Sequence, residues 1–331
     1  MNQIDFLAIG DTVIDDFIRL NDVAIKCDAH SDQCEMCLEW GGKIPYESNT
    51  VIAGTGNAAN AAVCAARLGL SSALCSVVGD DLRGTQCIEA LTGEQVDTSL
   101  IHRQSGVQTN YHYVLWHEAN RTILVHHDAF AYNVPTVKPK WAYLSSVAKD
   151  SLPFHHELLK WLSDNPEIKL AFQPGTFQIQ FGIEALRAIY GRSEIVFCNK
   201  EEAEHILGID NTDDIKNILQ KMKALGPKKV VVTDDVHGAY AIDDNGAMWH
   251  VPIYNDIKPP FERTGAGDAL SSSITTALAL GKPFAEALLW GPINAIKVTH
   301  EIGAQKGLIS REELEKILTT APESYKLTKY E

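Results

Sequence analysis

Arg263-Thr264-Gly265-Ala266-Gly267-Asp268-Ala269-Leu270 is the stretch that decides how the rest of the chain is interpreted. Two glycines separated by one small residue end in a carboxylate, and apolar residues then recur every three or four positions up to Gly281. This pattern predicts a glycine-rich turn that opens a helix. Such a turn is an anion site, because free N–H groups and the positive end of the helix dipole point at its occupant.

An acidic residue one turn inside an anion site would repel a phosphate unless it takes part in the reaction. Asp268 is therefore interpreted as a general base that takes the proton of an attacking hydroxyl. The N–H groups of Gly265, Ala266 and Gly267 would stabilise charge on the transferred phosphoryl group. The structural alternative is a glycine-containing loop capped by an aspartate; Thr264 and the long apolar helix disfavour it.

Composition sets the class of protein. The chain has 331 residues, 45% of them hydrophobic, and a net charge of −14. This is enough apolar material for one large α/β domain, and the second half continues the first without a linker, so a single domain over residues 1–331 is expected. The negative charge argues against nucleic acid or an anionic membrane as a partner. The N-terminal ten residues have no signal-peptide pattern and no apolar run could span a bilayer, so a cytoplasmic enzyme is expected.

The run Thr-Gly-Ala-Gly-Asp at 264–268 resembles the signature of the PfkB, or ribokinase-like, family of carbohydrate and nucleoside kinases. Other stretches that resemble this family extend from residue 10 to about residue 310. The resemblance implies a ribokinase-like α/β fold, with a doubly wound, mainly parallel sheet flanked by helices and a small inserted β-sheet lid. It implies ATP and Mg²⁺ as cofactors, and K⁺ as a further one beside Glu262.

Residues 17–52 interrupt the alternation of strands and helices, and they are interpreted as the first part of the lid. The second part is expected within 107–128, where Thr109–Trp116 and Arg121–His127 alternate as in a hairpin. A lid suits phosphoryl transfer to a sugar, because water must be excluded. In relatives this sheet forms a dimer interface, so the resemblance implies a homodimer through the lid.

The first part of the lid holds a cluster of sulfur and imidazole side chains, Cys27, His30, Cys34 and Cys37. These are the ligand types of a tetrahedral zinc site. Only three residues separate the two pairs, which is tighter than the usual finger spacing, and the resemblance does not imply a metal here. Free thiols are the alternative, and the spacing favours them.

Two stretches are expected to hold the acceptor. Phe6–Ile9 predicts a buried first strand, and Asp11 and Asp15 follow where ligands gather in doubly wound sheets. The resemblance implies that Asp15 binds sugar hydroxyls, with Asp11 beside it. It also implies acceptor contacts for Gly56, Asn57 and Asn60, because 54–60 resembles the family's first glycine-asparagine signature.

The same segment supports a rival interpretation. Gly54-x-Gly56-x-x-Ala59 fits a dinucleotide fingerprint, and Asp80 follows at about the right distance for a ribose contact. A nicotinamide-dependent oxidoreductase is therefore an alternative, but it gives no account of Asp268.

The resemblance also assigns residues to ATP and to its metal ion. The resemblance assigns Mg²⁺, held largely through water, to Asn199 and Glu202, which on their own form a helix-capping pattern. It assigns nucleotide contacts to Asn199, Thr233, Gly238, Thr264 and Asn294. Asp235 stands where the family has glycine, so its side chain must turn outward or gather metal.

Together these patterns predict an ATP-dependent kinase that phosphorylates a hydroxyl of a small neutral sugar. A nucleoside is the second candidate acceptor. A phosphosugar is a third, for which Lys43, Arg103 and Arg121 are the nearby cations by position.

Overall fold

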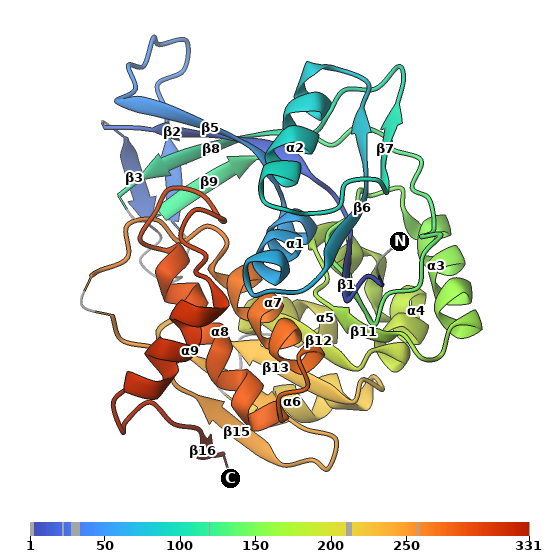
Figure 1. Cartoon of the computed structure of the whole chain (residues 1–331). Helices are drawn as coiled ribbons and strands as arrows, with labels where there is room; N and C mark the ends of the chain where they lie inside the picture. The colour runs from blue at the N-terminus through green and yellow to red at the C-terminus, as the bar shows by residue number, and fades with distance from the viewer. Residues whose placement is uncertain are drawn as a thin grey trace.

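The computed structural model describes residues 3–21, 23–27, 34–118, 120–209, 214–256 and 258–330. Its main feature is a central sheet covered by helices on both faces (Figure 1). The strands of this sheet are β1 (Phe6–Ile9), β6 (Ser72–Gly79), β7 (Ile101–Gln104), β10 (Trp141–Leu144), β11 (Lys169–Phe172), β12 (Ile195–Asn199), β13 (Lys229–Thr233), β14 (Ala239–Ile242), β15 (Met248–Val251) and β16 (Thr328–Lys329).

The order of strands is the one expected for a doubly wound fold. Neighbours follow the order β16-β15-β14-β13-β12-β11-β10-β1-β6-β7. Pairs from β13 through to β7 are parallel, and the pairs among β13, β14, β15 and β16 are antiparallel. The carboxyl ends of the parallel strands therefore meet at one edge, where ligands bind in such sheets.

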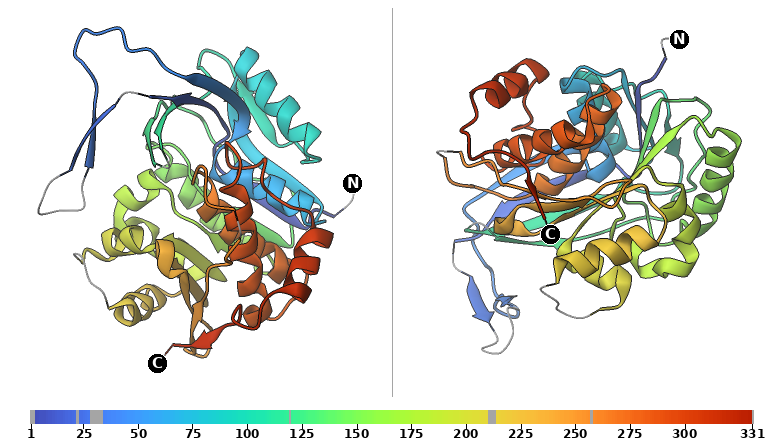
Figure 2. Two further views of the ribbon diagram at one scale, coloured as in Figure 1. Left: turned by 90° about the vertical axis from the view of Figure 1, so that its left-hand side faces the viewer. Right: turned by 90° about the horizontal axis from the view of Figure 1, so that it is seen from below.

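Helices on the two faces bury alternate residues of each strand. The helices are α1 (Asn57–Arg67), α2 (Leu82–Gly93), α3 (Leu152–Asp164), α4 (Thr176–Arg192), α5 (Lys200–Leu207), α6 (Ile215–Ala224), α7 (Ala266–Ala279), α8 (Phe284–Val298) and α9 (Arg311–Thr320). Viewed from below, α7–α9 lie on one side of the sheet and α3–α6 on the other (Figure 2).

Strand β1 shows how this arrangement is stabilised. Phe6 and Ala8 enter the apolar cluster under α1 and α7, whereas Leu7 and Ile9 enter the cluster under α3 to α6. All four are at most 1% exposed. Such double burial explains the unbroken apolar run in the sequence, and each large side chain contributes about 1.5–3 kcal/mol.

A second sheet, here called the lid sheet, lies across the carboxyl edge of the first. It has the order β5-β2-β8-β9, from β2 (Val13–Arg19), β5 (Ser48–Thr55), β8 (Tyr111–His117) and β9 (Asn120–Leu124). The two expected lid segments are thus brought together. The lid sheet begins earlier than expected, at Val13 and not at residue 17, so Asp15 lies in a lid strand.

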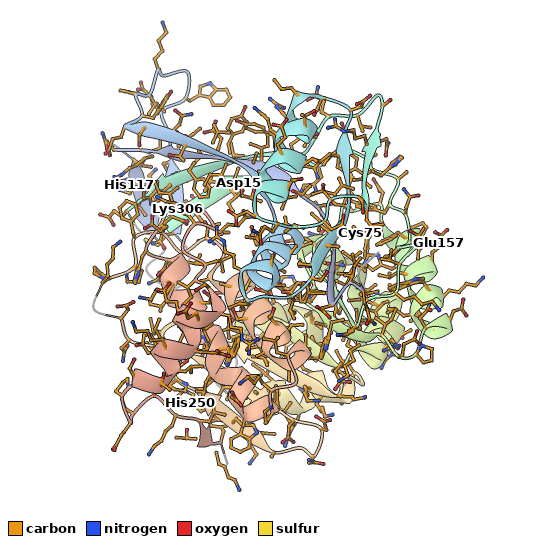
Figure 3. All side chains as sticks on the ribbon, in the orientation of Figure 1. Asp15, Cys75, His117, Glu157, His250 and Lys306 are labelled. Carbon is orange, nitrogen blue, oxygen red and sulfur yellow. A yellow bond between two sulfur atoms is a disulfide. The ribbon has the colours of Figure 1, made fainter. Side chains whose placement is uncertain are left out.

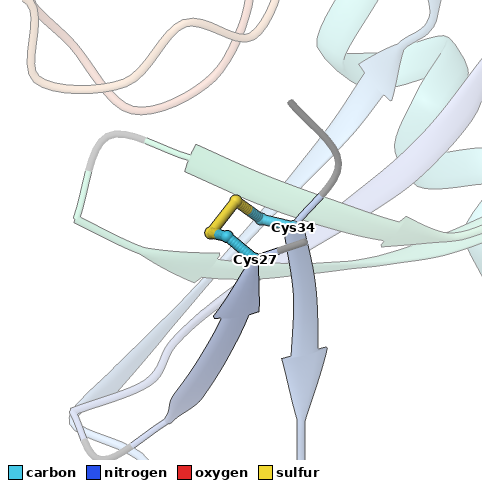
Figure 4. Close-up of a disulfide and its surroundings, with 2 residues drawn as sticks. All are labelled: Cys27 and Cys34. Carbon is cyan, nitrogen blue, oxygen red and sulfur yellow. A yellow bond between two sulfur atoms is a disulfide. The ribbon is translucent and has the colours of Figure 1, made fainter. Parts of the chain in front are cut away.

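The cysteine cluster lies in a separate hairpin of β3 (Ala24–Cys27) and β4 (Cys34–Cys37), which projects from the lid sheet (Figure 2). Cys27 and Cys34 are directly opposite in the strand register and are joined by a disulfide (Figure 4). A disulfide sulfur is not a thiolate ligand, so this pairing differs from both the zinc site and the free thiols expected there. Cys37 is free, and His30 lies outside the described residues.

No helix in the described part of the chain has the length and apolar character to cross a bilayer.

Candidate active site

The predicted anion-binding turn is present at the start of α7. Gly265 precedes the helix in the left-handed region, with φ +82°. A Cβ atom at this position would lie 2.2 Å from the Cβ of Ala304, so the turn requires glycine on both conformational and steric grounds. Asp268 follows in the first helical turn, and Gly265, Gly267 and Asp268 line one cavity.

Three amide side chains hold the carboxylate of Asp268. Asn57 and Gln173 each donate a hydrogen bond to Oδ1, both over 3.0 Å. Asn60 donates to Oδ2 over 2.8 Å. Asn57 and Asn60 lie one turn apart on α1, which packs against α7, whereas Gln173 follows strand β11. Hydrogen bonds from neutral amides favour the ionised carboxylate and fix its direction.

Two of the amide side chains that bind Asp268 are fixed by further hydrogen bonds. The hydroxyl of Tyr143 donates to Gln173 Oε1, and Ser271 Oγ lies 2.7 Å from the same hydroxyl. Gln305 donates to Asn60 Oδ1 over 3.0 Å, which leaves the amide nitrogen of Asn60 facing Asp268. This second layer of contacts fixes the orientation of the amides, so the carboxylate is positioned before any substrate binds.

Burial of the Asp268 carboxyl raises its pKa above the usual value, and the hydrogen bonds from Asn60, Gln173 and Asn57 act in the opposite direction. Asp268 is only 8% exposed. A carboxylate with raised proton affinity is a better base than an ordinary aspartate in water.

A cavity of about 520 Å³ opens in front of Asp268. It lies at the carboxyl edge of the central sheet, as expected for a doubly wound fold. Its walls come from the turn before α7, from the ends of three parallel strands and from the lid strand β9: Gly265, Gly267, Gln173, Asn199, Thr233 and Arg121.

Asn199 and Glu202 line this cavity and also form a capping box at the start of α5. Asn199 Oδ1 accepts from the Glu202 N–H over 2.7 Å, and Glu202 Oε2 accepts from the Asn199 N–H over 2.9 Å. Burial raises the pKa of the Glu202 carboxyl, and the charge of Asp268 adds to this effect. Two carboxylates and an amide oxygen facing one cavity are a donor set that suits Mg²⁺.

Glu262 lies beneath the turn and is completely buried. Its Oε1 accepts from the N–H of Thr264 over 2.8 Å and from the Thr264 hydroxyl over 2.5 Å. Arg121 Nε from the lid lies 3.8 Å from the same oxygen. The other oxygen, Oε2, is buried without a hydrogen-bond partner among the described residues. A buried, unpartnered carboxylate oxygen fits a cation ligand.

Asp235, which stands where the resemblance implied a glycine, turns toward Arg263. Arg263 Nη1 lies 3.1 and 3.3 Å from its two carboxylate oxygens. Both residues line the cavity, as do Thr233 and Thr264. The carboxylate is therefore paired with a cation, which removes the conflict with a bound triphosphate that the sequence presented.

The predicted acceptor residues Asp11 and Asp15 are buried, 3% and 7% exposed. Figure 3 places Asp15 in the lid sheet, at the end nearer the body of the molecule than His117. Tyr132 donates to Asp11 Oδ1 over 2.6 Å. His127 Nδ1 lies 3.1 Å from Asp11 Oδ2, and His112 Nδ1 lies 3.3 Å from Asp15 Oδ1.

Several predicted site residues make contacts within the protein. The amide nitrogens of Asn57 and Asn60, which were expected to meet the acceptor, donate to Asp268. Asn57 also lines the cavity, so its acceptor contact stays a prediction. Gly56 has φ +104°, and a Cβ there would lie 2.9 Å from the carbonyl oxygen of Asp11, so it permits a close backbone approach. Gly238 permits another, because a Cβ there would lie 2.4 Å from Val251 O.

Asn294 was expected to contact the nucleotide but is not among the residues that line the cavity. It is fully buried, donates to Ser273 Oγ over 2.9 Å and accepts from the Ile309 N–H over 3.0 Å. Its amide is thus used in packing α8 against α7 and the segment before α9.

Sequence reasoning missed the side chains that contact Asp268, its amide partners and the two predicted acceptor residues, Asp11 and Asp15: Gln173, Tyr143, Ser271, Tyr132, His112 and His127. Gln173 carried a usable signal, because it directly follows a buried strand and precedes Pro174, at the edge where ligands bind. The lid histidines carried none, since alternation in a strand does not say which imidazole faces the core.

The chain matches the sequence profile described as pfkB family carbohydrate kinase over residues 22–310. It is 24% identical over 274 residues to a ribokinase from Haemophilus influenzae, covering 80% of this chain and 87% of that protein. It is 30% identical to the bifunctional protein HldE of Proteus mirabilis, but the match spans only 34% of this chain and 24% of that protein.

Solved structures share the fold. A ribokinase from Arabidopsis thaliana complexed with ribose and ATP superimposes with a TM-score of 0.77 at 18% identity, covering 96% of this chain and 99% of that one. A nucleoside kinase from Methanocaldococcus jannaschii gives 0.74 at 19% identity, with coverage of 96% and 99%. The expected ribokinase-like fold is confirmed.

Proposed function

Because the chain belongs to the pfkB family of carbohydrate kinases, and is thus a phosphotransferase, we propose that it transfers the γ-phosphate of ATP to a hydroxyl of a small neutral sugar. One observation carries the proposal: three amides aim the buried carboxylate of Asp268 into a cavity whose floor is the turn at Gly265. A positioned base beside an anion site is what phosphoryl transfer to an alcohol requires.

The reaction follows from these positions. The acceptor hydroxyl binds beside Asp268 and gives its proton to the carboxylate as its oxygen attacks the γ-phosphorus. The N–H groups of Gly265, Ala266 and Gly267 stabilise the charge that develops on the phosphoryl oxygens. Arg121 lines the cavity from the lid strand β9 and brings a positive charge near the transferred phosphoryl group. When the lid covers the cavity, this side chain therefore lies beside the reacting groups.

The same oxygen donors support sites for the cofactors. Asn199 and Glu202 would hold Mg²⁺ largely through water, and the ion would neutralise charge on the ATP phosphates. Thr233 and Thr264 would contact those phosphates. K⁺ would lie at Glu262, whose Oε2 is buried without a hydrogen-bond partner in the described part of the chain.

A nucleoside is the second candidate acceptor. Phe177 packs edge-on against His127 beside the acceptor aspartates, with ring centroids 5.5 Å apart. Phe177 is partly buried, and an aromatic ring of this kind provides apolar surface against which a base can pack.

We also propose that the protein acts in the cytoplasm as a homodimer formed by the lid sheet. Apolar side chains on β5, β8 and β9 and just after β9 are between 43% and 55% exposed: Val51, Tyr113, Leu124 and Val125. A second copy would cover this surface. Light scattering after gel filtration tests this, and a monomer at micromolar concentration would contradict it.

A coupled assay of ADP release tests the function. The wild-type protein is mixed with Mg-ATP and a panel of free sugars, sugar phosphates and nucleosides, and one free sugar is expected to give acceptor-dependent turnover. Asp268→Asn should lower kcat by about 10²–10⁴-fold while ATP binding stays the same. Loss of ATP binding by the same factor would contradict the assignment of Asp268 as the base.

A further inference from the structure

Residues 303–308, here called the coupling segment, lie between α8 and α9 and pack against two parts of the candidate site. Gly303 lies against the lid sheet, because a Cβ atom there would be 2.4 Å from Cδ1 of Ile52 in strand β5. Ala304 lies against the anion-binding turn, at 2.2 Å from the position of a Cβ on Gly265. The lid sheet and the anion-binding turn therefore contact adjacent residues of one segment.

The next residue of the coupling segment, Gln305, has a side-chain amide with one possible orientation. Its Nε2 donates to the carbonyl oxygen of Gly54 over 2.7 Å, and a backbone carbonyl only accepts. The second N–H of this nitrogen donates to Asn60 Oδ1 over 3.0 Å, so Asn60 presents its own nitrogen to Asp268 Oδ2. Because Gly54 belongs to β5, a lid strand sets the direction of this chain of hydrogen bonds.

Arg67, at the end of α1, holds the coupling segment from another side. Its Nη1 donates to the carbonyl oxygens of Gln305 and Leu308, over 2.8 and 2.7 Å. The remaining donors of the guanidinium face Glu94, which accepts from Nε and Nη2, both over 2.8 Å. This bidentate contact fixes the plane of the guanidinium and directs Nη1 at the two carbonyls. Asn60 lies about two turns earlier on the same helix, so α1 binds the coupling segment at two points.

We propose that the coupling segment makes the orientation of the Asp268 carboxylate depend on the position of the lid, and that Arg67 and Gln305 are positioning residues for it. This inference rests on the proposed function. A lid strand in the observed position orients Gln305, which orients Asn60, which holds Oδ2 of the carboxylate. The base is therefore fully oriented only when the lid covers the cavity, which disfavours transfer of the phosphoryl group to water.

The first test is Arg67→Met, which keeps an unbranched side chain and removes every donor. The matched control is Arg192→Met, because Arg192 also donates to backbone carbonyl oxygens but lies at the end of α4. A conservative variant, Arg67→Lys, keeps a cation that can reach one carbonyl. The measurements are the pH profile of kcat/KM with Mg-ATP and D-ribose or D-fructose, whichever is turned over faster, and the KM of ATP.

Arg67→Met should move the acid limb of kcat/KM upward by about half to one pH unit, which is a loss of about three- to tenfold at pH values below the wild-type limb. The reason is that a poorly oriented Asn60 amide stabilises the ionised form of Asp268 less. The KM of ATP should stay the same, Arg67→Lys should recover part of the loss, and Arg192→Met should match the wild type. A loss of equal size at every pH would mean a structural role only and would overturn the inference.

The same substitution in an Asn60→Ala background separates positioning from a structural effect. Because Asn60 carries the effect of the coupling segment to Asp268, Arg67→Met should leave the acid limb where Asn60→Ala alone puts it. Gln305→Met should behave like Arg67→Met in both backgrounds. The decrease in thermal stability that Arg67→Met causes should appear in both. A second shift of the acid limb, as large as the first, would show that Arg67 does not act through Asn60.

Gly303→Ala tests the contact with the lid. Its Cβ would overlap Ile52, so the lid strand and the coupling segment cannot both keep their positions. The acid limb should move upward as in Arg67→Met, and adding Ile52→Ala, which removes the overlapping atom, should reverse part of the shift. Alanine is strained at φ +85° equally in the single and the double variant, so their difference isolates the contact. Identical acid limbs in these two variants would mean that the lid contact does not reach Asp268.

A measurement without turnover separates this inference from the proposed function. The difference in free energy of unfolding between each protein and its Asp268→Asn counterpart, followed over pH, reports the proton affinity of Asp268 whether or not the protein is a kinase. Arg67→Met should raise the pH at which this difference levels off, and Arg192→Met should not. A raised value without turnover of any acceptor would support the inference and contradict the kinase. Turnover with an unchanged value would support the kinase and overturn the inference.

Discussion

Asn60 donates a hydrogen bond of 2.8 Å to Oδ2 of Asp268, across 208 residues of sequence, and no other described side chain donates to that oxygen. Asn57 and Gln173 both use Oδ1. The two oxygens of the proposed base are therefore held unequally, and Asn60 alone determines the environment of Oδ2.

Asn60→Ala should lower kcat/KM at neutral pH by about tenfold or more, because a lost hydrogen bond to a charged group weakens the ionised form. The loss should shrink as pH rises, since the pKa of Asp268 would increase further. The measurement is the pH profile of kcat/KM. Asn49→Ala, which removes an amide donor to Asp16, is the control. An acid limb at the same pH in Asn60→Ala and wild type would contradict this role.

The stability of the protein should also depend on Asp268. Burial raises the pKa of its carboxyl in the folded state, so the folded chain binds this proton more tightly than the unfolded chain. The contribution of this group to the free energy of unfolding is therefore full below the ordinary aspartate pKa and is lost as pH rises through the raised value. The asparagine side chain of Asp268→Asn does not titrate, so the stability of this variant lacks this dependence on pH.

Denaturant unfolding at several pH values between 4 and 8 measures this effect. The free energy of unfolding of Asp268→Asn relative to wild type should increase with pH and then level off. Parallel curves for the two proteins would mean that Asp268 has the same proton affinity in the folded and unfolded chains.

Gly265→Ala should destabilise the fold by about 2–4 kcal/mol, because alanine is strained at φ +82° and its Cβ would overlap Ala304. Gly267→Ala is the matched control for stability. It lies inside α7, and a Cβ there has no neighbour within 4 Å. Its stability should be equal to or slightly above that of the wild type. Thermal unfolding distinguishes the two variants, and equal effects would show that the turn tolerates a side chain.

Much of the fold could be predicted from short apolar runs. Phe6–Ile9 was predicted as a strand with the bounds that the structure has, since strands buried on both faces need continuous apolar sequence. The start of the lid was predicted wrongly, at residue 17, because strand β2 begins at Val13 and includes Asp15 and Asp16. Both are buried in a lid strand, where tertiary partners supply the hydrogen bonds.

The part of the candidate site whose residues are adjacent in the sequence could be predicted. The turn before α7 combines its glycines, helix start and acid in five residues, so sequence was sufficient. The donors to Asp268 come from α1 and from the end of β11, and only the packing of α1 on α7 reveals that Asn57 and Asn60 face the base. The pairing of Cys27 with Cys34 likewise follows from strand register, which cysteine spacing does not determine.

Arg263 and Asp235 form the last ion pair with a consequence for function, because both residues line the cavity. The pair is exposed, so its contribution to stability is at most about 1 kcal/mol. Its effect should appear in nucleotide binding. Arg263→Ala leaves the carboxylate of Asp235 unpaired near the ATP phosphates and should raise the KM of ATP about fivefold, less at high salt.

Asp235→Gly added to Arg263→Ala should restore most of the ATP affinity, since it removes the unpaired charge and relieves a residue held at φ +41°. Lys282→Ala, which breaks the exposed pair with Glu286 on the surface of α8, is the control and should leave the KM of ATP unchanged. Steady-state kinetics at two salt concentrations makes the comparison. A double variant that binds ATP more weakly than Arg263→Ala alone would mean that Asp235 itself contacts the nucleotide or its metal, so that Arg263 holds a ligand in place and does not merely neutralise it.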